Sequence, residues 1–407
     1  MRSRDVYHRV QQRQLRGRDD VGSTKAGGLA PRVVAIGVVA CLMSAACGTA
    51  TVTGTPPTVP SSPTSSHTAA APSGASGCLV GEAWNAYAEE RIALWDQPAM
   101  EKPIAAAHDD YEAVDARADV ATQVAQIAGF VSKGAKVIVV RATGGFPDGA
   151  VTAELLGAID RAAGAGVAVI AYDRIIDSPK VLELAFDPVE IGRMEARALL
   201  AAKPTGNYAI IKGHPQGQLE PDLIASGIHE VLQPAIDKGD IKVVAETYTV
   251  NWDPATAQTE MQTILSENHN KIDAVISEDD NMAGGVVAAL KEVGLDGKVA
   301  VAGQGGDVWG LNRVALGTQT VDVWPDLRLL GKAAGDAAVA LCKNPDIAKL
   351  AGTRPLTMPS HNQVTSILVA PQQVTKDNLN VVIDSAWAKK TDVCVSVDSW
   401  KAPPACR

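Results

Sequence analysis

From Leu79 onward, short apolar runs of strand length alternate with longer stretches in which apolar residues recur every three or four positions. The short runs predict β-strands, and the longer stretches predict amphipathic helices. Val120, Val124, Ile127 and Phe130, for example, would share one face of a helix. The predicted strands are, in chain order, 79–84, 111–114, 136–141, 167–172, 182–186, 208–212, 242–250, 274–277, 299–303 and 319–323.

Several of these strands, such as VIVV at 137–140, are apolar throughout, which is typical of strands buried on both faces of a parallel sheet. About ten strands are too many for one sheet of ordinary size. We therefore expect an α/β fold with two doubly wound parallel-sheet lobes of five or six strands each. In such sheets a ligand binds in the crevice beyond the carboxyl ends of the strands.

Residues 1–46 have the order of a secretory signal, because basic residues precede an apolar run at 33–46 that ends in small residues. Ser44-Ala45-Ala46 before Cys47 resembles a bacterial lipobox, in which the cysteine receives a lipid and becomes the new N-terminus. Cys41 is the alternative lipidated cysteine, and an ordinary signal with two passive cysteines is a further alternative. We expect a signal peptide with a lipobox, and an exported protein anchored on the outer face of the cytoplasmic membrane or free in the periplasm.

Residues 47–77 consist almost entirely of Thr, Ser, Pro, Ala and Gly. Such a segment cannot bury enough apolar surface to offset the entropy lost on ordering. The sequence therefore predicts a disordered linker between the lipid anchor and the folded body.

The charge distribution excludes one class of partner. The chain of 407 residues has a formal net charge of −9, and from Cys47 onward it holds 29 Lys/Arg against 43 Asp/Glu. Nonspecific nucleic-acid binding needs clustered basic residues, so we expect no nucleic-acid partner. No apolar run reaches 18 residues, so we expect no transmembrane helix.

Four cysteines remain beyond the predicted signal, and an even number in an exported protein favours two disulfides. Spacing favours Cys394 with Cys406, which leaves Cys78 with Cys342. Cys78 begins the first strand, and Cys342 ends a predicted helix that would run antiparallel to it at the same sheet edge. The chain has no Cys-x-x-Cys pair, so we expect no zinc site, and its seven scattered histidines show no metal spacing, so we expect no other metal. We also expect no cofactor.

Polar and aromatic side chains recur directly after the predicted strands, where a crevice would lie. Carboxylates and amides accept hydrogen bonds from hydroxyls, arginine donates through a planar fork, and tryptophan offers a flat apolar face. This mixture is typical of a site for a ligand rich in hydroxyl groups. The segments concerned are 84–91, 141–145, 172–174, 213–218, 251–253, 278–281, 304–307 and 324–326.

Five segments resemble the periplasmic xylose-binding proteins of sugar ABC importers, a family of type I periplasmic binding proteins. The resemblance covers roughly residues 79–385. It is carried by VIAYDR at 169–174, LQPAIDKGDIKVV at 232–244, NKIDAVI at 270–276, MAGG at 282–285 and LGTQT at 316–320.

The resemblance implies two lobes that are joined by a three-segment hinge and close on a monosaccharide. We expect residues 78–185 plus 324–360 to form the N-terminal lobe. Residues 186–323 plus 361–385 would form the C-terminal lobe, and residues 386–407 a C-terminal tail.

The family's ligand-binding positions can be carried over residue by residue. Arg174 and Trp252 match a ligand-binding arginine and a tryptophan that packs on the sugar ring. Arg91 matches an arginine whose aromatic neighbour is replaced by Ile92, so Trp84 or Tyr87 would supply the stacking ring. The other expected ligand contacts are Asp279, in place of an asparagine, and Gln218 and Gln304, which lie in or near altered binding loops.

These residues also have structural interpretations. Arg91 could be a surface helix residue, and Trp252 could be a core residue. Arg174 could pair with Asp173 or Asp177 and only brace the hinge. Asp279 could cap a helix, although Asp280 fits that role better. Because the altered positions include Pro325, where the family has a lysine, we expect a ligand other than xylose itself. The candidates are a neutral sugar, a polyol, or an amino sugar whose ammonium pairs with Asp279.

The expected function is that of a monomeric solute-binding lipoprotein that delivers a small carbohydrate to an ABC transporter permease. No nucleophile elbow, zinc-protease motif or P-loop stands in a suitable context, so we do not expect an enzyme. A sensory protein that presents its ligand to a membrane receptor is the alternative. A sugar-responsive regulator is a weaker one, because a signal and linker occupy the place of a DNA-binding helix-turn-helix.

Overall fold

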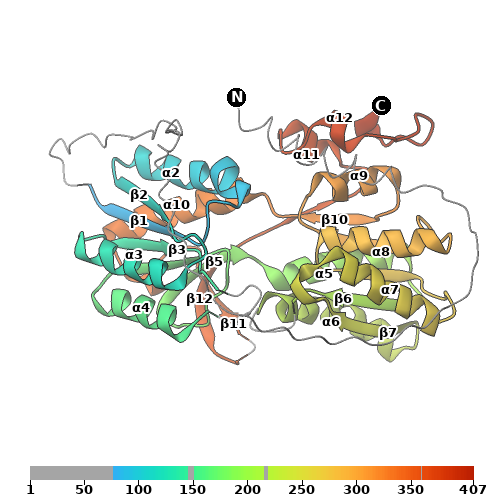
Figure 1. The fold of residues 1–407 in the computed structure, drawn as a ribbon, viewed down its shortest axis with the longest axis horizontal. Coiled ribbons are helices and arrows are strands. Elements are labelled where there is room, and N and C mark those ends of the chain that lie inside the picture. The colour runs from blue at the N-terminus through green and yellow to red at the C-terminus, as the bar shows by residue number, and fades with distance from the viewer. Residues whose placement is uncertain (1–76, 145–150, 215–218, 359) are drawn as a thin grey trace, which may run out of the picture. The chain divides into compact units, whose positions relative to one another are not determined.

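The computed structural model describes residues 77–144, 151–214, 219–358 and 360–407. Their strands form two sheets, and each sheet has helices on both faces (Figure 1). The predicted two-lobed α/β class is therefore confirmed. The predicted signal peptide, nearly all of the predicted linker, Cys41 and Cys47 lie outside the described residues.

The sheet of the first lobe has seven strands in the order β11-β12-β5-β4-β3-β1-β2. Its central strands are parallel, while β11 runs antiparallel to β12 at the edge. The strands are β1 (Leu79–Trp84), β2 (Asp110–Asp115), β3 (Val137–Val140), β4 (Ala168–Tyr172), β5 (Val181–Phe186), β11 (Arg354–Thr357) and β12 (Gln363–Val369).

The sheet of the second lobe has six strands in the order β13-β10-β9-β8-β6-β7. All pairs are parallel except β13 with β10. The sequence predicted purely parallel sheets, whereas each sheet is mixed because it has one antiparallel edge strand. The strands are β6 (Gly206–Lys212), β7 (Ile241–Tyr248), β8 (Ala274–Ser277), β9 (Ala300–Gln304), β10 (Val321–Trp324) and β13 (Gln372–Val374).

The helices cover the sheets with the apolar faces that their sequence periodicity predicts. Phe130 and Ile127 of α3 pack with Leu155 and Ile159 of α4 on one face of the first sheet. The helices of this lobe are α2 (Gln97–Ala106), α3 (Val120–Ser132), α4 (Ala153–Gly164) and α10 (Leu327–Lys343), with the short helices η1 (Ile92–Asp96) and η3 (Ile347–Lys349).

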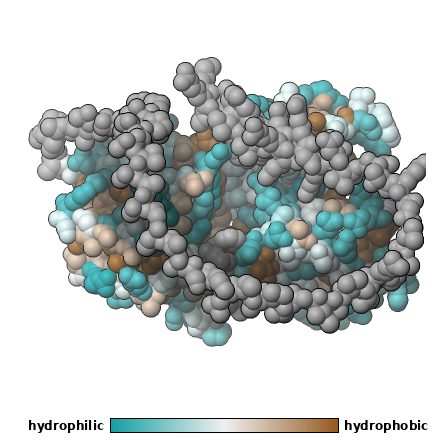
Figure 2. Space-filling view, in the orientation of Figure 1, coloured by the Kyte–Doolittle hydropathy of each residue, from teal (hydrophilic) through white to brown (hydrophobic). Residues whose placement is uncertain are grey.

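Two glycines let helices of the second lobe approach closely. A Cβ atom on Gly192 would lie 2.0 Å from the carbonyl oxygen of Ile224, and one on Gly227 would lie 2.0 Å from that of Val189, so α5 and α6 pack backbone to backbone. The helices are α5 (Pro188–Ala202), α6 (Glu220–Asp237), α7 (Pro254–Glu267), α8 (Asp280–Glu292) and α9 (Val308–Leu316), with the short η2 (Val250–Trp252). None of the helices in the described ranges is long and apolar enough to span a bilayer. Where grey atoms do not cover the face drawn in Figure 2, hydrophilic residues are interspersed with apolar ones.

The chain passes between the two sheets three times, after β5, after β10 and after β12. This confirms the three-segment hinge but corrects the position of the third crossing. Residues 361–385 were expected in the C-terminal lobe, whereas β12 pairs with β5 in the first sheet and the second sheet resumes only at β13. The error arose because the pattern of apolar runs predicted no strand after residue 323, although QVTSILV at 363–369 is rich in β-branched residues.

Both predicted disulfides are present, Cys78–Cys342 and Cys394–Cys406. The second closes the C-terminal segment, which contains α11 (Asn380–Asp384), α12 (Lys390–Val393) and η4 (Pro404–Cys406) and packs against α9. Trp387 of this segment donates from its indole nitrogen to the Gly306 carbonyl at 2.7 Å. Its ring stacks on Trp95 of the first lobe, with 5.2 Å between centroids, so the segment contacts both lobes.

The carboxyl group of Glu195, on α5, is buried and forms no hydrogen bond with the described residues. It is fully buried, and neither carboxylate oxygen has a partner among the described residues. Burial raises the pKa of Glu195 well above its usual range, and the Asp280 carboxylate adds to this effect. Glu278 lies nearby with the pKa of its carboxyl raised by burial in the same way, so both groups favour the protonated form in the folded chain.

We expect the free energy of unfolding to fall as the pH rises from about 5 to about 8, because the folded state keeps protons that the unfolded state releases. Glu195→Gln should remove the part of this pH dependence that Glu195 contributes. The variant should match the wild type near pH 5 and exceed it near pH 8 in urea unfolding. Glu267→Gln, at an exposed position, is the control and should follow the wild-type slope. A Glu195→Gln variant with the wild-type pH dependence would contradict this assignment.

Candidate functional site

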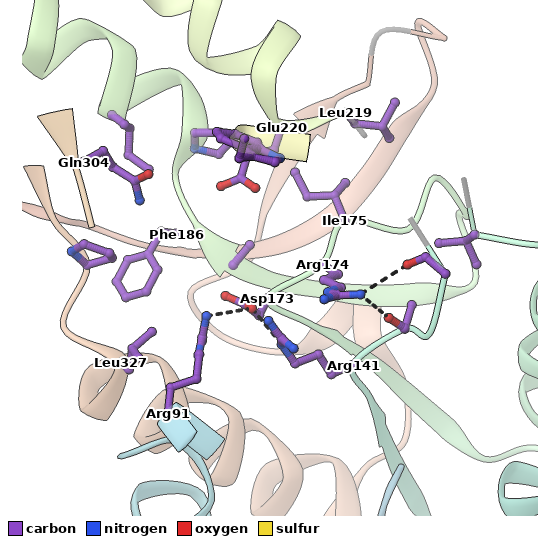
Figure 3. A pocket seen from close by; sticks show the side chains of 18 residues that line it. Arg91, Arg141, Asp173, Arg174, Ile175, Phe186, Leu219, Glu220, Gln304 and Leu327 are labelled. Atoms are coloured by element: carbon purple, nitrogen blue, oxygen red, sulfur yellow. Dashed lines mark hydrogen bonds and ion pairs between the residues drawn. The ribbon is translucent and has the colours of Figure 1, made fainter. Parts of the chain in front are cut away.

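A cavity of about 300 Å³ lies beyond the carboxyl ends of strands from both sheets, where the sequence predicted a crevice. This volume is at the lower end of the range for small-molecule sites. Its polar lining comes mainly from the first lobe, and both lobes add apolar side chains (Figure 3). The side chains with chemical character are Arg91, Arg141, Asp173, Arg174, Phe186, Glu220, Trp252 and Gln304.

The Asp173 carboxylate joins two arginines of the first lobe. Its Oδ2 atom lies 2.8 Å from Nε of Arg141 and 3.1 Å from Nη1 of Arg91. Arg91 also donates from Nε and Nη2 to the Asp96 carboxylate, at 2.9 Å each. Tyr172, which precedes Asp173, donates its hydroxyl to Asp96 at 2.5 Å, so the segments after β1 and β4 are tied together.

Glu89 neutralises the other side of the arginine cluster. Arg141 donates from Nη1 to Glu89 at 2.7 Å and to Asn85 at 2.6 Å. Arg174 reaches the same carboxylate from Nη2 at 3.3 Å, and its Nη1 donates to the carbonyls of Ala142 and Gly144 at 3.0 and 3.2 Å. Arg174 therefore braces the loop after β3 and makes no ion pair with Asp173 or Asp177 within 4.0 Å.

The arginines set the charge states of the carboxylates around them. Burial alone would raise the pKa of Asp173, but the guanidiniums of Arg91 and Arg141 hold it well below its usual range. Burial likewise opposes ionisation of Glu89, and Arg141 outweighs it, so the pKa of this carboxyl is also lowered. Both groups are therefore ionised at neutral pH, and together with Asp96 they offset the positive charges of the three arginines.

Trp252 follows β7 and reaches the cavity from the second lobe. A Cβ atom on Gly213 would lie 2.1 Å from the outer edge of its indole, so only glycine lets the ring lie there. Gln304 ends β9 and lines the same cavity. The structure thus brings four predicted residues, Arg91, Arg174, Trp252 and Gln304, to one cavity, and their contact with a ligand stays a prediction.

Two predicted ligand contacts lie elsewhere, and a third cannot be placed. Trp84 was expected to stack on the ligand, but it is fully buried in the core, edge-on to Tyr172 with 5.6 Å between ring centroids. Asp279 does not line the cavity; it caps α8 by accepting from the backbone nitrogen of Met282 at 2.9 Å, the role expected of Asp280. Gln218 lies outside the described residues.

The prediction also missed three charged residues at the cavity. Arg141 and Asp173 directly follow β3 and β4, so the rule that ligands bind at strand ends already pointed to them. Their roles were hidden because each acts through the other, across 32 residues of sequence. Glu220 begins α6 and ends the 216–220 loop, which the sequence marked as the replacement of a family binding loop, but Gln218 was chosen from that loop instead.

Two α/β lobes, three crossing segments and a polar cavity at the strand ends define a two-lobed binding protein of type I architecture. The chain belongs to the family described as periplasmic binding protein domain, whose model matches residues 85–346. The resemblance predicted from the sequence is therefore confirmed.

Individual relatives agree with this assignment. The chain is 34% identical to a D-xylose-binding periplasmic protein of Escherichia coli (strain K12), over 67% of this chain and 79% of the relative. It is 29% identical to a xylitol-binding protein of Mycolicibacterium smegmatis, over 65% of this chain and 68% of the relative. Among solved structures, an ABC transporter solute-binding protein from Clostridium phytofermentans with bound β-D-glucose superimposes with a TM-score of 0.62 at 26% identity, covering 77% of this chain and 99% of that one.

We expect Asp173→Asn to lower the free energy of unfolding by about 3 kcal/mol, because it leaves two poorly solvated guanidiniums without the carboxylate between them. Urea unfolding at neutral pH measures the change. Asp160→Asn removes an exposed ion pair with Lys180 and should leave the midpoint unchanged. An Asp173→Asn variant as stable as the wild type would contradict a structural role for this carboxylate.

Proposed function

We propose that this protein is an extracytoplasmic solute-binding lipoprotein that binds a monosaccharide, polyol or related small carbohydrate between its lobes and delivers it to an ABC transporter permease. The observation that carries the proposal is that one cavity at the strand ends is lined by Arg91 and Arg174 from one lobe and by Trp252 and Gln304 from the other. The names of the relatives, which bind xylose, xylitol or glucose, agree with this class of ligand.

The chemistry of the lining suits a ligand that is hydroxyl-rich around its rim and apolar on its C–H faces. Carboxylates, the amide of Gln304 and the arginines can exchange hydrogen bonds with hydroxyls. Trp252 and Phe186 offer flat apolar faces for the C–H groups. No step of bond making or breaking is proposed, and the protein acts as a monomeric carrier without a cofactor.

Closure of the lobes is the mechanism that follows from this arrangement. A ligand that contacts both lobes stabilises the closed state more than the open one, and so shifts the equilibrium between them. The three crossing segments serve as the hinge, and Asp187 at the first of them is held to Arg354 of β11 at 2.6 Å. The permease would then distinguish the closed, loaded form from the open one.

Isothermal titration calorimetry against xylose, other pentoses, hexoses, cyclitols and polyols tests the proposal. We expect at least one sugar or polyol other than xylose to bind, and Trp252→Ala to weaken that binding at least tenfold. Trp400→Ala removes an indole that is 74% exposed and should bind as the wild type does. The absence of binding by every member of the panel would overturn the proposed function, and binding of xylose alone would overturn the altered specificity.

The lipid anchor is tested separately. In cells that process bacterial lipoproteins, the wild type should be retained in the membrane fraction and carry an N-terminal diacylglyceryl cysteine in mass spectra. Cys47→Ser should release the protein into the soluble exported fraction, while Cys41→Ser should not. Release by Cys41→Ser and not by Cys47→Ser would show that Cys41 is the lipidated residue. Membrane retention of the double variant would overturn the proposed lipid anchor at either cysteine.

A further inference from the structure

Three arginines at one cavity suggest a site for an anion, but the contacts around them argue otherwise. Arg91 is paired with Asp96 and Asp173, and Arg141 is paired with Asp173 and Glu89. Arg174 shares Glu89. Three cationic groups thus face three carboxylates within the first lobe, and this wall of the cavity carries no net charge.

Glu220 adds a carboxylate from the other lobe. It stands at the first position of α6, and its side chain points into the cavity toward Asp173 and the arginines (Figure 3). No described residue forms a hydrogen bond or ion pair with its carboxylate. Burial raises the pKa of Glu220 to about 7, with Asp173 adding to the rise and Arg91, Arg174 and Arg141 opposing it.

Asp173 is the carboxylate that Glu220 faces, and it has capacity left for a ligand. Both of its arginine contacts go to Oδ2, and no described residue donates a hydrogen bond to Oδ1. Two carboxylates from opposite lobes therefore face the same space with acceptor atoms free. Without a positive group between them they repel each other across the closing cavity.

We propose that the cavity selects a hydroxyl-rich ligand that carries a protonated amine, and that Glu220 and Asp173 bind this amine from the two lobes. The inference deepens the proposed function and rests on it. An ammonium donates up to three hydrogen bonds and would bring the charge of the site to zero. Because it bridges the lobes, the same contact would stabilise the closed state.

The corresponding sugar acids are excluded by the same arrangement. Every guanidinium at the cavity is already paired, so a ligand carboxylate would gain no free arginine and would face Glu220 directly. With a neutral ligand, the protonated carboxyl of Glu220 would form a neutral hydrogen bond with a ligand hydroxyl. Charge-assisted hydrogen bonds are about twice as strong as neutral ones, so the amine should be preferred.

Calorimetry with matched ligands tests this selection. The probes are glucose, galactose, xylose, xylitol and myo-inositol, each with mono-amino derivatives in which one hydroxyl is replaced, and glucuronate as the acid. We expect one amino derivative to bind about tenfold or more tightly than its parent, and glucuronate not to bind. Glu220→Gln should reduce the ratio of amino-derivative affinity to parent affinity to near one, whatever its effect on the affinity for the parent itself. Glu230→Gln, exposed on the same helix, should keep the preference.

Proton exchange supplies a second readout. An ammonium beside Glu220 lowers the pKa of this carboxyl, so binding of the amino derivative near neutral pH should release a proton, measured from the binding enthalpy in buffers of different ionisation enthalpy. Glu220→Gln should remove this release.

The possible outcomes separate the two proposals. A neutral parent that binds more tightly than every amino derivative would overturn the amine selection and leave the proposed function intact. An amine preference that survives in Glu220→Gln would overturn the role of Glu220. The absence of binding by any probe would count against the proposed function itself and against the inference with it.

Discussion

The carboxylate of Asp173, held between the guanidiniums of Arg91 and Arg141, is the contact on which the site depends. It fixes three segments that follow different strands of one sheet, and it does so in surroundings where an unpaired charge would be costly. Because those segments also carry Arg174 and Glu89, the geometry of the whole first-lobe wall depends on a single ionised group. The second lobe can then approach a surface that is rigid and electrically balanced before any ligand arrives.

The fold was largely predictable from the chain itself. The ten predicted strands correspond to β1 to β10, and the apolar signal is continuous where parallel strands are fully buried, as in β3 and β4. The strands missed, β11, β12 and β13, are those at or near antiparallel edges, where burial is partial and the signal is weak. One missed strand was enough to shift the boundary of a lobe, since β12 lies in the sheet opposite to the one expected.

The site was less predictable, and the reasons are physical. Arg174, Trp252 and Gln304 follow or end predicted strands, and the resemblance to the family supported the choice of Arg174 and Trp252, so all three could be selected from the sequence and all three line the cavity. Trp84 also stands at a strand end, but its side chain turns into the core, and the alternation of faces along a strand decides this. Asp279 was chosen by resemblance, yet the backbone of α8 needs a cap at that position. Paired charges such as Arg141 and Asp173 have no sequence signature, because their partners meet only in space.

Trp387 of the C-terminal segment meets two other indoles and one guanidinium at the junction of the lobes. The ring of Trp387 lies against both Trp95 and Trp324, and the Arg328 guanidinium lies within 6 Å of all three ring centroids. Trp95 belongs to one lobe, whereas Trp324 and Trp387 belong to the other. Any rotation about the hinge must therefore change how these rings overlap, and with it their ultraviolet emission. Intrinsic tryptophan fluorescence should therefore report the relative orientation of the lobes without an attached dye.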